Sequence, residues 1–173
     1  MRRVLRKQLD HTTHFAGRFG AVYFITICCD ARGTNQLCNE RISKVLFDTA
    51  RIYHERDRWN LNLLLLMPDH LHCLIGIDGR DSLSHVIRDY KRITTKLASI
   101  RWQRNFFDHR LRHDESLAEK FAYICQNPIR AGLVQNERRG RCIVYSLAPA
   151  VLQQGEAEHL NLGCCRLELP KGE

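Results

Sequence analysis

Two histidines separated by a single residue are the part of this sequence best suited to metal chemistry. His70 and His72 stand in Met-Pro-Asp-His-Leu-His, between two apolar runs. In a β-strand, residues i and i+2 project from the same face, so both imidazoles can meet one divalent cation while Leu71 points to the opposite layer. The alternative is two unrelated histidines on a sheet. The apolar strand that follows, with Cys73, Leu74 and Ile75, favours the metal site because titratable side chains are otherwise out of place there.

A tyrosine and an asparagine one helical turn apart are the next candidates. Tyr123 and Asn127 lie four residues apart, just before Pro128. Residues at this spacing share a helix face. A tyrosine hydroxyl is a weak nucleophile until a nearby cation favours its phenolate. The alternative is that Tyr123 is a packing residue and Asn127 a helix end. Tyr90 is the rival nucleophile, but it fits the apolar stripe of its own helix and is predicted to lie in the core.

The charge balance favours a polyanionic partner. The 173 residues include 27 Lys and Arg against 19 Asp and Glu, a net charge of +8, and phosphate contacts release counterions. One expected helix carries four candidate phosphate contacts: Arg88, Lys91, Arg92 and Lys96. The alternative for these four is an ordinary solvated helix face. Three aromatic residues, Trp102, Phe106 and Phe107, can stack on bases, although core packing is the favoured interpretation.

Hydrophobic periodicity predicts the elements that position these residues. Strands are expected over residues 22–28, 61–67, 71–77 and 102–108. Helices are expected over 42–56, 82–99 and 116–126, and 142–147 is strand-like. This order predicts an α+β fold, namely a ferredoxin-like βαββαβ antiparallel sheet with helices on one face plus a C-terminal helix.

Cysteine spacing and hydropathy exclude several classes of protein. The eight cysteines include no C-x-x-C pair, and two pairs are adjacent in sequence, which disfavours a disulfide framework or a zinc site. A zinc deaminase would need such a C-x-x-C pair in addition to its histidine ligand and glutamate base. No apolar run follows Met1-Arg2-Arg3, and the apolar stretch 61–67 is too short to span a bilayer. We therefore expect a cytoplasmic chain with one domain over 1–150 and a variable tail over 151–173.

Taken in order, four segments of the chain resemble a known family. They are Met67 to His72, the basic helix from Ser82 to Lys96, Trp102-Gln103 followed by Phe107-Asp108-His109, and Tyr123-Ile-Cys-Gln-Asn-Pro-Ile-Arg-Ala-Gly132. Together they resemble the REP-associated tyrosine transposases, a branch of the single-tyrosine, IS200-like transposases in the HUH endonuclease superfamily. The resemblance covers about residues 18–147; the stretch after about 148 matches no pattern of the family.

The resemblance implies a role for each candidate residue. His70, His72 and Asn127 would hold Mg²⁺ or Mn²⁺, and Tyr123, on a C-terminal catalytic helix, would attack DNA and form a 5′-phosphotyrosine. The implied activity is a single-stranded DNA endonuclease and strand transferase in DNA transposition, acting at palindromic repeats that fold into hairpins. An inactive or repurposed hairpin-binding protein of the same fold is the alternative. The resemblance favours a monomer, with a dimer as the alternative, and assigns no role to Asp108 and His109.

Overall fold

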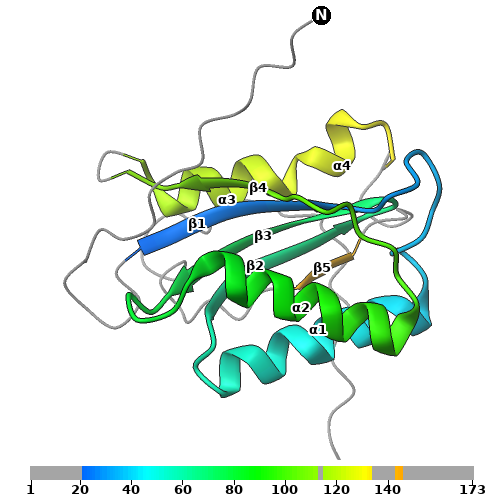
Figure 1. Ribbon diagram of the computed structural model, residues 1–173. Helices are drawn as coiled ribbons and strands as arrows, with labels where there is room; N and C mark the ends of the chain where they lie inside the picture. Colours follow the sequence, from blue (N-terminus) through cyan, green and yellow to red (C-terminus); the bar gives the residue numbers. More distant parts are fainter. Residues whose placement is uncertain (1–20, 113–114, 134–142, 146–173) are drawn as a thin grey trace, which may run out of the picture.

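The chain folds around one antiparallel sheet. The computed structural model describes residues 21–112, 115–133 and 143–145. Its elements in chain order are β1 (Ala21–Cys28), α1 (Glu40–Glu55), β2 (Asn60–Met67), β3 (His70–Ile77), α2 (Leu83–Ala98), β4 (Phe107–Arg110), α3 (Leu117–Cys125), α4 (Asn127–Arg130) and β5 (Ile143–Tyr145). The strand order is β4-β1-β3-β2-β5, and every neighbouring pair is antiparallel (Figure 1). Since β1 and β2 both flank β3, the predicted βαββαβ arrangement is confirmed.

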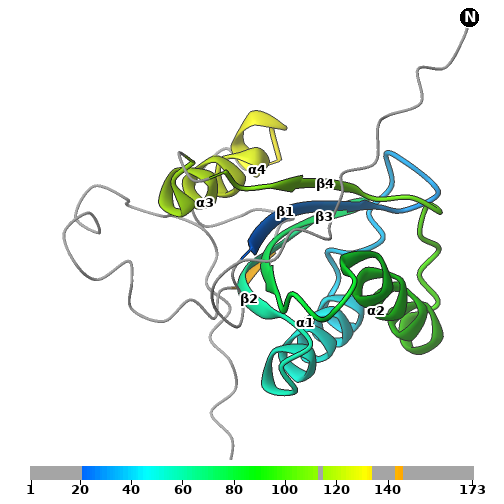
Figure 2. The same cartoon turned by 60° about the vertical axis from the view of Figure 1, so that its left-hand side comes forward.

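The helices lie in two layers on opposite faces of the sheet. Figure 2 shows α1 and α2 side by side beneath the sheet, and α3 and α4 above it. Hydrophobic residues of the strands alternate accordingly: Ile25 and Ile27 join the core under α1 and α2, whereas Phe24 packs with the cluster under α3. This layering follows from the two-residue period of a strand. It confirms the expected pair of helices on one face with a separate C-terminal helix.

The face under α1 and α2 is closed by a large apolar core. An aromatic group of Tyr53, Trp59 and Tyr90 lies at its centre, with ring centroids 5.1–5.8 Å apart. Trp59 donates through Nε1 to the carbonyl oxygen of Ala50 at 3.0 Å, and the Tyr90 hydroxyl donates to the carbonyl oxygen of Leu46 at 3.0 Å. Tyr90 is only 1% exposed, so its predicted place in the core is confirmed.

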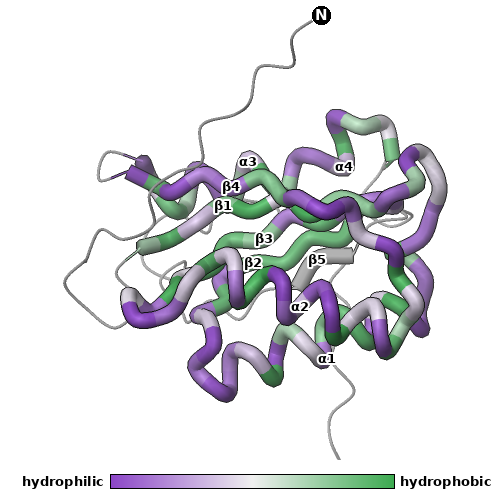
Figure 3. Tube along the Cα trace, in the orientation of Figure 1, coloured by the Kyte–Doolittle hydropathy of each residue, from purple (hydrophilic) through white to green (hydrophobic). Residues whose placement is uncertain are grey.

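Strand β2 is apolar on both faces because both are covered. Figure 3 shows β2 and β3 as hydrophobic along most of their length. The register of β2 against β3 shifts between Leu61 and Leu63, which places a bulge at Asn62. Leu61 therefore packs under α1 and α2 while Leu63 packs under α3, although two residues separate them and a regular strand would put both on one face.

The predicted element ends agree with the structure except near the fourth strand. That strand covers Phe107–Arg110 rather than 102–108, and Trp102 forms only an isolated bridge with Cys29. Gln103 and Arg104 belong to no strand, and their carbonyl oxygens accept from the Lys91 ammonium at 2.6 and 2.9 Å.

Several predicted regions lie partly or wholly outside the described residues. They are residues 1–20, the two ends of the strand-like stretch 142–147, whose middle is β5, and the tail 151–173. In the described part of the chain, none of the helices has the length and hydropathy needed to cross a membrane.

Candidate metal and nucleophile site

The histidine pair begins directly after a tight turn that many contacts fix. Met67 pairs with His70, so Pro68 and Asp69 form a two-residue hairpin loop. The β1–α1 loop lies against this turn: the backbone N–H groups of Gln36 and Leu37 both donate to the Pro68 carbonyl oxygen, at 2.7 and 3.0 Å. The backbone N–H of Cys29 donates to the Asp69 carbonyl oxygen at 2.8 Å. These hydrogen bonds hold the start of β3 against a loop that lies more than 30 residues earlier in the chain.

Asp69 orients His70. The Nδ1 atom of His70 lies 2.7 Å from Oδ1 of Asp69, and because a carboxylate only accepts, Nδ1 carries the proton. Gly33, whose φ of 76° is in the region that favours glycine, donates its N–H to Oδ2 of Asp69 at 2.7 Å. Burial would raise the pKa of the Asp69 carboxyl, but the N–H groups of Gly33 and His70 and the guanidinium of Arg32 hold that pKa below its ordinary value.

Thr26 orients His72 from the neighbouring strand. These residues face each other in the β1–β3 register, and Oγ1 of Thr26 lies 2.9 Å from Nδ1 of His72. Burial, followed by the charges of His70 and Arg32, lowers the pKa of His72 from 6.5 to about 3. His72 is therefore neutral at physiological pH. When Nδ1 donates to Thr26, the neutral ring presents a lone pair on Nε2.

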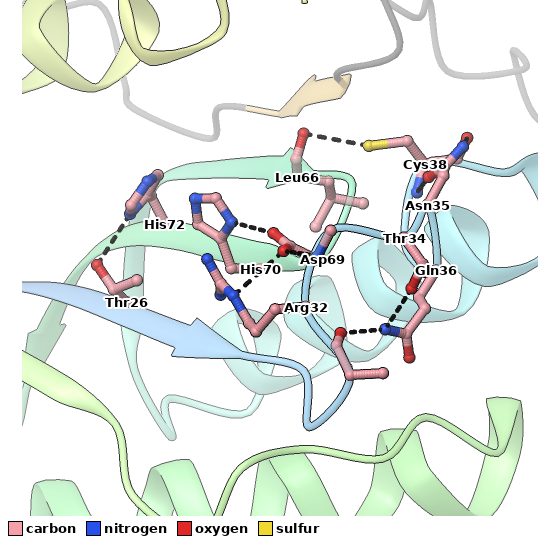
Figure 4. Close-up of polar contacts among 12 residues, drawn as sticks. Thr26, Arg32, Thr34, Asn35, Gln36, Cys38, Leu66, Asp69, His70 and His72 are labelled. Carbon is pink, nitrogen blue, oxygen red and sulfur yellow. Dashed lines mark hydrogen bonds and ion pairs between the residues drawn. The ribbon is translucent and has the colours of Figure 1, made fainter. Parts of the chain in front are cut away.

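This arrangement fits two ligands of a divalent cation. The imidazole rings lie 4.8 Å apart between centroids, and both use Nδ1 for a neighbouring side chain (Figure 4). Among the described residues, no hydrogen bond engages Nε2 of either ring. Ligand histidines are typically oriented by such a hydrogen bond through their other nitrogen. No group of three or more His, Cys, Asp or Glu in the described residues is placed to hold a metal, so this part of the chain supplies the two imidazoles without a third ligand of those types.

Tyr123 lies on the helix above the same face of the sheet, but on its solvent side. Phe121, Ile124 and Cys125 of α3 pack with the apolar side chains of this face. Tyr123 lies about 200° around the helix from Phe121 and is 47% exposed. Its ring is flanked by the Lys120 ammonium at 5.8 Å and by the Arg130 guanidinium at 4.6 Å. Within the described chain, no contact joins this ring to His70 or His72.

Asn127 begins the short helix α4 rather than continuing α3. Helix α3 ends at Cys125, and Gln126 separates the two helices with a helical φ of −82° and ψ of −10°. Asn127 is half-buried, with Pro128 buried behind it. The predicted helix 116–126 is thus confirmed, with Ser116 as its N-cap. The structure places Tyr123 and Asn127 over the histidine face of the sheet without bringing either into contact with the imidazoles.

The four predicted phosphate contacts lie on α2, across the sheet from the histidine pair. Arg88 and Lys96 are exposed, and Arg92 is exposed with its Nε 3.6 Å from Asp89. Lys91 binds the two loop carbonyls described above, and burial lowers the pKa of its ammonium. Lys91 therefore has a structural task, whereas Arg88 and Lys96 remain available to a polyanion.

The aromatic segment divides between core and surface. Trp102 donates through Nε1 to Oγ1 of Thr94 at 3.0 Å and packs with Phe106 on the core under α1 and α2. Phe107 is 39% exposed and pairs with Thr26, on the face of the histidines. His109 lies on that face too, but its Nε2 contacts Glu115 at 2.9 Å.

Sequence reasoning did not assign roles to three residues that complete the histidine site: Thr26, Arg32 and Asp69. Asp69 had a local signal, since it precedes the first histidine in the motif. Thr26 and Arg32 had none, because they lie 46 and 37 residues from their partners, and the sheet register brings Thr26 there and the path of the β1–α1 loop brings Arg32.

Comparison with known proteins identifies the family of this chain. Residues 18–126 match the family described as "Transposase IS200 like". A Haemophilus influenzae protein provisionally described as a REP-associated tyrosine transposase is 25% identical over 135 residues, which cover 67% of this chain and 74% of that protein. Another, described as uncharacterized, is 23% identical over 154 residues, covering 67% and 84%.

A solved structure has the same fold. The REP-associated tyrosine transposase bound to a REP hairpin aligns with a TM-score of 0.58 at 22% identity, covering 74% of this chain and 78% of that one.

Proposed function

This chain belongs to the IS200-like transposase family, and we propose that it is a metal-dependent endonuclease and strand transferase acting on single-stranded DNA at hairpin repeats. One observation carries the proposal. Two imidazoles on one strand face are each oriented through Nδ1, by Asp69 and by Thr26, and neither Nε2 is engaged within the described chain. Histidine ligands of metal ions are oriented in this way, through one ring nitrogen while the other is left for the metal.

The proposed cation is Mg²⁺ or Mn²⁺, held by His70 and His72 with the amide oxygen of Asn127 as a further ligand. When bound, it would polarise the scissile phosphate and neutralise the negative charge that develops there. The neutral state of His72, whose pKa burial lowers to about 3, keeps that ring competent as a ligand across the physiological pH range.

The proposed nucleophile is the Tyr123 hydroxyl. Its oxygen loses the phenolic proton and forms a bond to the phosphorus atom. The bond from phosphorus to the 3′ oxygen breaks. The leaving oxygen takes up a proton and becomes a free 3′-hydroxyl. The 5′-phosphotyrosine keeps the energy of the broken ester, so a 3′-hydroxyl can later reverse the step and join two strands without nucleotide hydrolysis.

Three features support single-stranded DNA as the partner. The chain carries a net charge of +8, and the exposed Arg88 and Lys96 on α2 and the exposed Arg130 beside Tyr123 suit phosphate contacts. Phe107 presents an exposed ring on the face of the histidines, where a base can stack. The structural relative was solved with a REP hairpin bound, and we propose a DNA hairpin as the ligand here, bound by a monomer.

The test is a labelled DNA hairpin with single-stranded flanks, incubated with the full chain and Mn²⁺. We expect cleavage in a flank and a protein–DNA adduct that survives denaturing electrophoresis, both abolished by EDTA. Peptide mass mapping of the adduct should place the DNA on Tyr123. Hairpin binding without any metal-dependent cleavage would contradict the enzymatic proposal.

The placement of Tyr123 favours one second candidate, a hairpin-binding protein of the same fold that does not cut DNA. The Tyr123 ring lies on the solvent side of α3 between two cations, away from the histidines. The same assay separates the two, since a binding protein retains the hairpin and forms no adduct.

A further inference from the structure

We propose that Arg32 is a DNA-binding residue of this site, whose guanidinium binds the phosphate group that the His70–His72 pair faces. The proposal rests on the proposed function, because it concerns the same phosphate. Arg32 lies in the loop between β1 and α1, about 40 residues before the histidines, and no sequence motif marks it.

Arg32 is held at one atom and leaves the rest of its guanidinium available. Its Nε lies 3.2 Å from Oδ2 of Asp69, and the side chain is 48% exposed. In the described part of the chain, neither Nη group makes a hydrogen bond or an ion pair. An arginine fork binds a phosphate through two parallel N–H donors. The atoms needed for that contact are the ones that the protein does not use.

Asp69 places this guanidinium beside the imidazoles. One carboxylate oxygen, Oδ1, accepts from His70, and the other, Oδ2, contacts both the Gly33 N–H and Arg32 Nε. A single carboxylate, only 8% exposed, thereby fixes His70 and Arg32 relative to each other. Holding a charged group in place beforehand lowers the entropic cost of binding its ligand.

The guanidinium also lies on the same side of the sheet as the two histidines. Figure 4 shows it extending from its loop toward the His70 ring, beside the end of β1 that carries Thr26. Its positive charge is close enough to lower the pKa values of both His72 and Asp69. The Arg32 guanidinium and a metal ion held by the imidazoles would repel each other, because both are positively charged. A phosphate bound between them would offset that repulsion.

A competing explanation is that Arg32 only compensates the buried charge of Asp69 and so keeps His70 in place. The two explanations predict different effects on metal affinity. Without DNA, loss of a positioning arginine weakens Mn²⁺ binding. Loss of a phosphate-binding arginine leaves Mn²⁺ affinity unchanged, or raises it slightly because a nearby positive charge is gone.

Arg101 provides a matched control. Its guanidinium also contacts one aspartate, Asp30, at 3.2 Å, and its side chain is 83% exposed. Arg32→Gln and Arg101→Gln therefore remove one exposed arginine and one single-carboxylate contact each. Only the first is beside the histidines. Arg32→Lys keeps the charge and loses the fork.

The first experiment measures binding without cleavage. The full chain carrying Tyr123→Phe is titrated with a fluorescent DNA hairpin that has single-stranded flanks, in Mn²⁺ and in EDTA at equal ionic strength. We expect Mn²⁺ to tighten binding about tenfold, Arg32→Gln to remove most of that gain, Arg32→Lys to restore part of it, and Arg101→Gln to leave it unchanged. Equal gains in Arg32→Gln and Arg101→Gln, or no gain in the parent, would overturn the proposal.

The second experiment measures Mn²⁺ binding by calorimetry in the absence of DNA. We expect Arg32→Gln to bind Mn²⁺ at least as tightly as the parent, whereas a drop of about tenfold would assign Arg32 to positioning instead. Neither experiment depends on strand cleavage. Failure of the covalent adduct to form would refute the proposed function, while these two results decide the role of Arg32 separately.

Discussion

The two faces of the sheet differ in how completely they are covered. Under α1 and α2 the face is sealed by a large core around Trp59 and Tyr90, each about 1% exposed. Under α3 the cluster is smaller, with seven buried members among the residues that the structure describes. That second face continues into the histidine pair and the exposed Phe107, while the exposed Tyr123 lies above it on the solvent side of α3.

The difference separates stability from chemistry within one sheet. Alternate residues of the same strands serve the two faces: in β3, Leu71 and Cys73 are core, and His70 and His72 are site. Changes on the closed face should therefore act on the free energy of unfolding, and changes on the open face on reaction with DNA. Four predictions follow in order of decreasing effect: those at Tyr123 and Trp59 test this division, and those for His72 and the outer surface of α2 show where it does not hold.

The largest effect is expected at Tyr123 on the open face. Tyr123→Phe removes the attacking oxygen and should reduce adduct formation by at least about 10⁴-fold, with hairpin affinity and thermal stability close to those of the parent because the side chain is 47% exposed. Denaturing electrophoresis and fluorescence titration measure the two quantities. Tyr90→Phe is the control, since that hydroxyl is buried against the Leu46 carbonyl oxygen. An adduct that persists in Tyr123→Phe and disappears in Tyr90→Phe would reverse the assignment.

On the closed face, Trp59→Ala should be the most damaging change to stability. Trp59 is 1% exposed and packs between Tyr53 and Tyr90, so its loss should lower the free energy of unfolding by about 3–5 kcal/mol. Urea denaturation followed by circular dichroism gives the value. Ile129→Ala on the open side, where Ile129 is 63% exposed, should cost less than about 0.5 kcal/mol. Similar costs at the two positions would remove the distinction between the faces.

Acid should destabilise the protein through His72. The pKa of His72 is about 3 in the folded chain against an ordinary 6.5, so the unfolded chain takes up a proton that the folded chain does not. The free energy of unfolding therefore falls as pH drops below about 6.5, by up to about 1.4 kcal/mol per pH unit, and levels off below about 3.

The pH range chosen for this measurement isolates His72 from the carboxylates. Asp69 and Glu115 have lowered pKa values, so their contributions are lost only as pH falls below their ordinary values of 3.8 and 4.5. Urea unfolding of the parent and of His72→Gln at pH 6.5 and 5 should show the steeper loss in the parent. Equal losses would mean that His72 is not held neutral by burial.

The smallest effect is expected for the basic surface of α2. If Arg88 and Lys96 contact phosphates, replacing both with alanine should weaken hairpin binding a few-fold and reduce the salt dependence by about one unit of slope per lost contact. The rate of adduct formation at saturating DNA should not change, because α2 lies across the sheet from the histidines. Lys44→Ala, an exposed lysine on α1 that pairs with Asp48, is the control. An effect no larger than that of Lys44→Ala would identify the α2 cations as an ordinary solvated face.

Local periodicity in the sequence determined the elements and which residues share a face. The two-residue period of a strand is enough to place His70 and His72 together and Leu71 opposite, and the helical period is enough to put Tyr90 in the core. The order of these elements then predicted the ferredoxin-like sheet, because few topologies connect them without crossing.

Tertiary structure alone decided how the site is completed. Thr26 reaches His72 across 46 residues, and Gly33 reaches Asp69 across 36, contacts that depend on strand register and on the path of one loop. The bulge at Asn62 and the side of the sheet on which α2 and α3 pack depend in the same way on many distant contacts acting at once. The sequence by itself determined which residues could do chemistry, and the assembled sheet decided that Asp69, Thr26 and Arg32 surround the histidines while Tyr123 faces solvent. The physical reason is that periodicity acts within one element, whereas a site joins several.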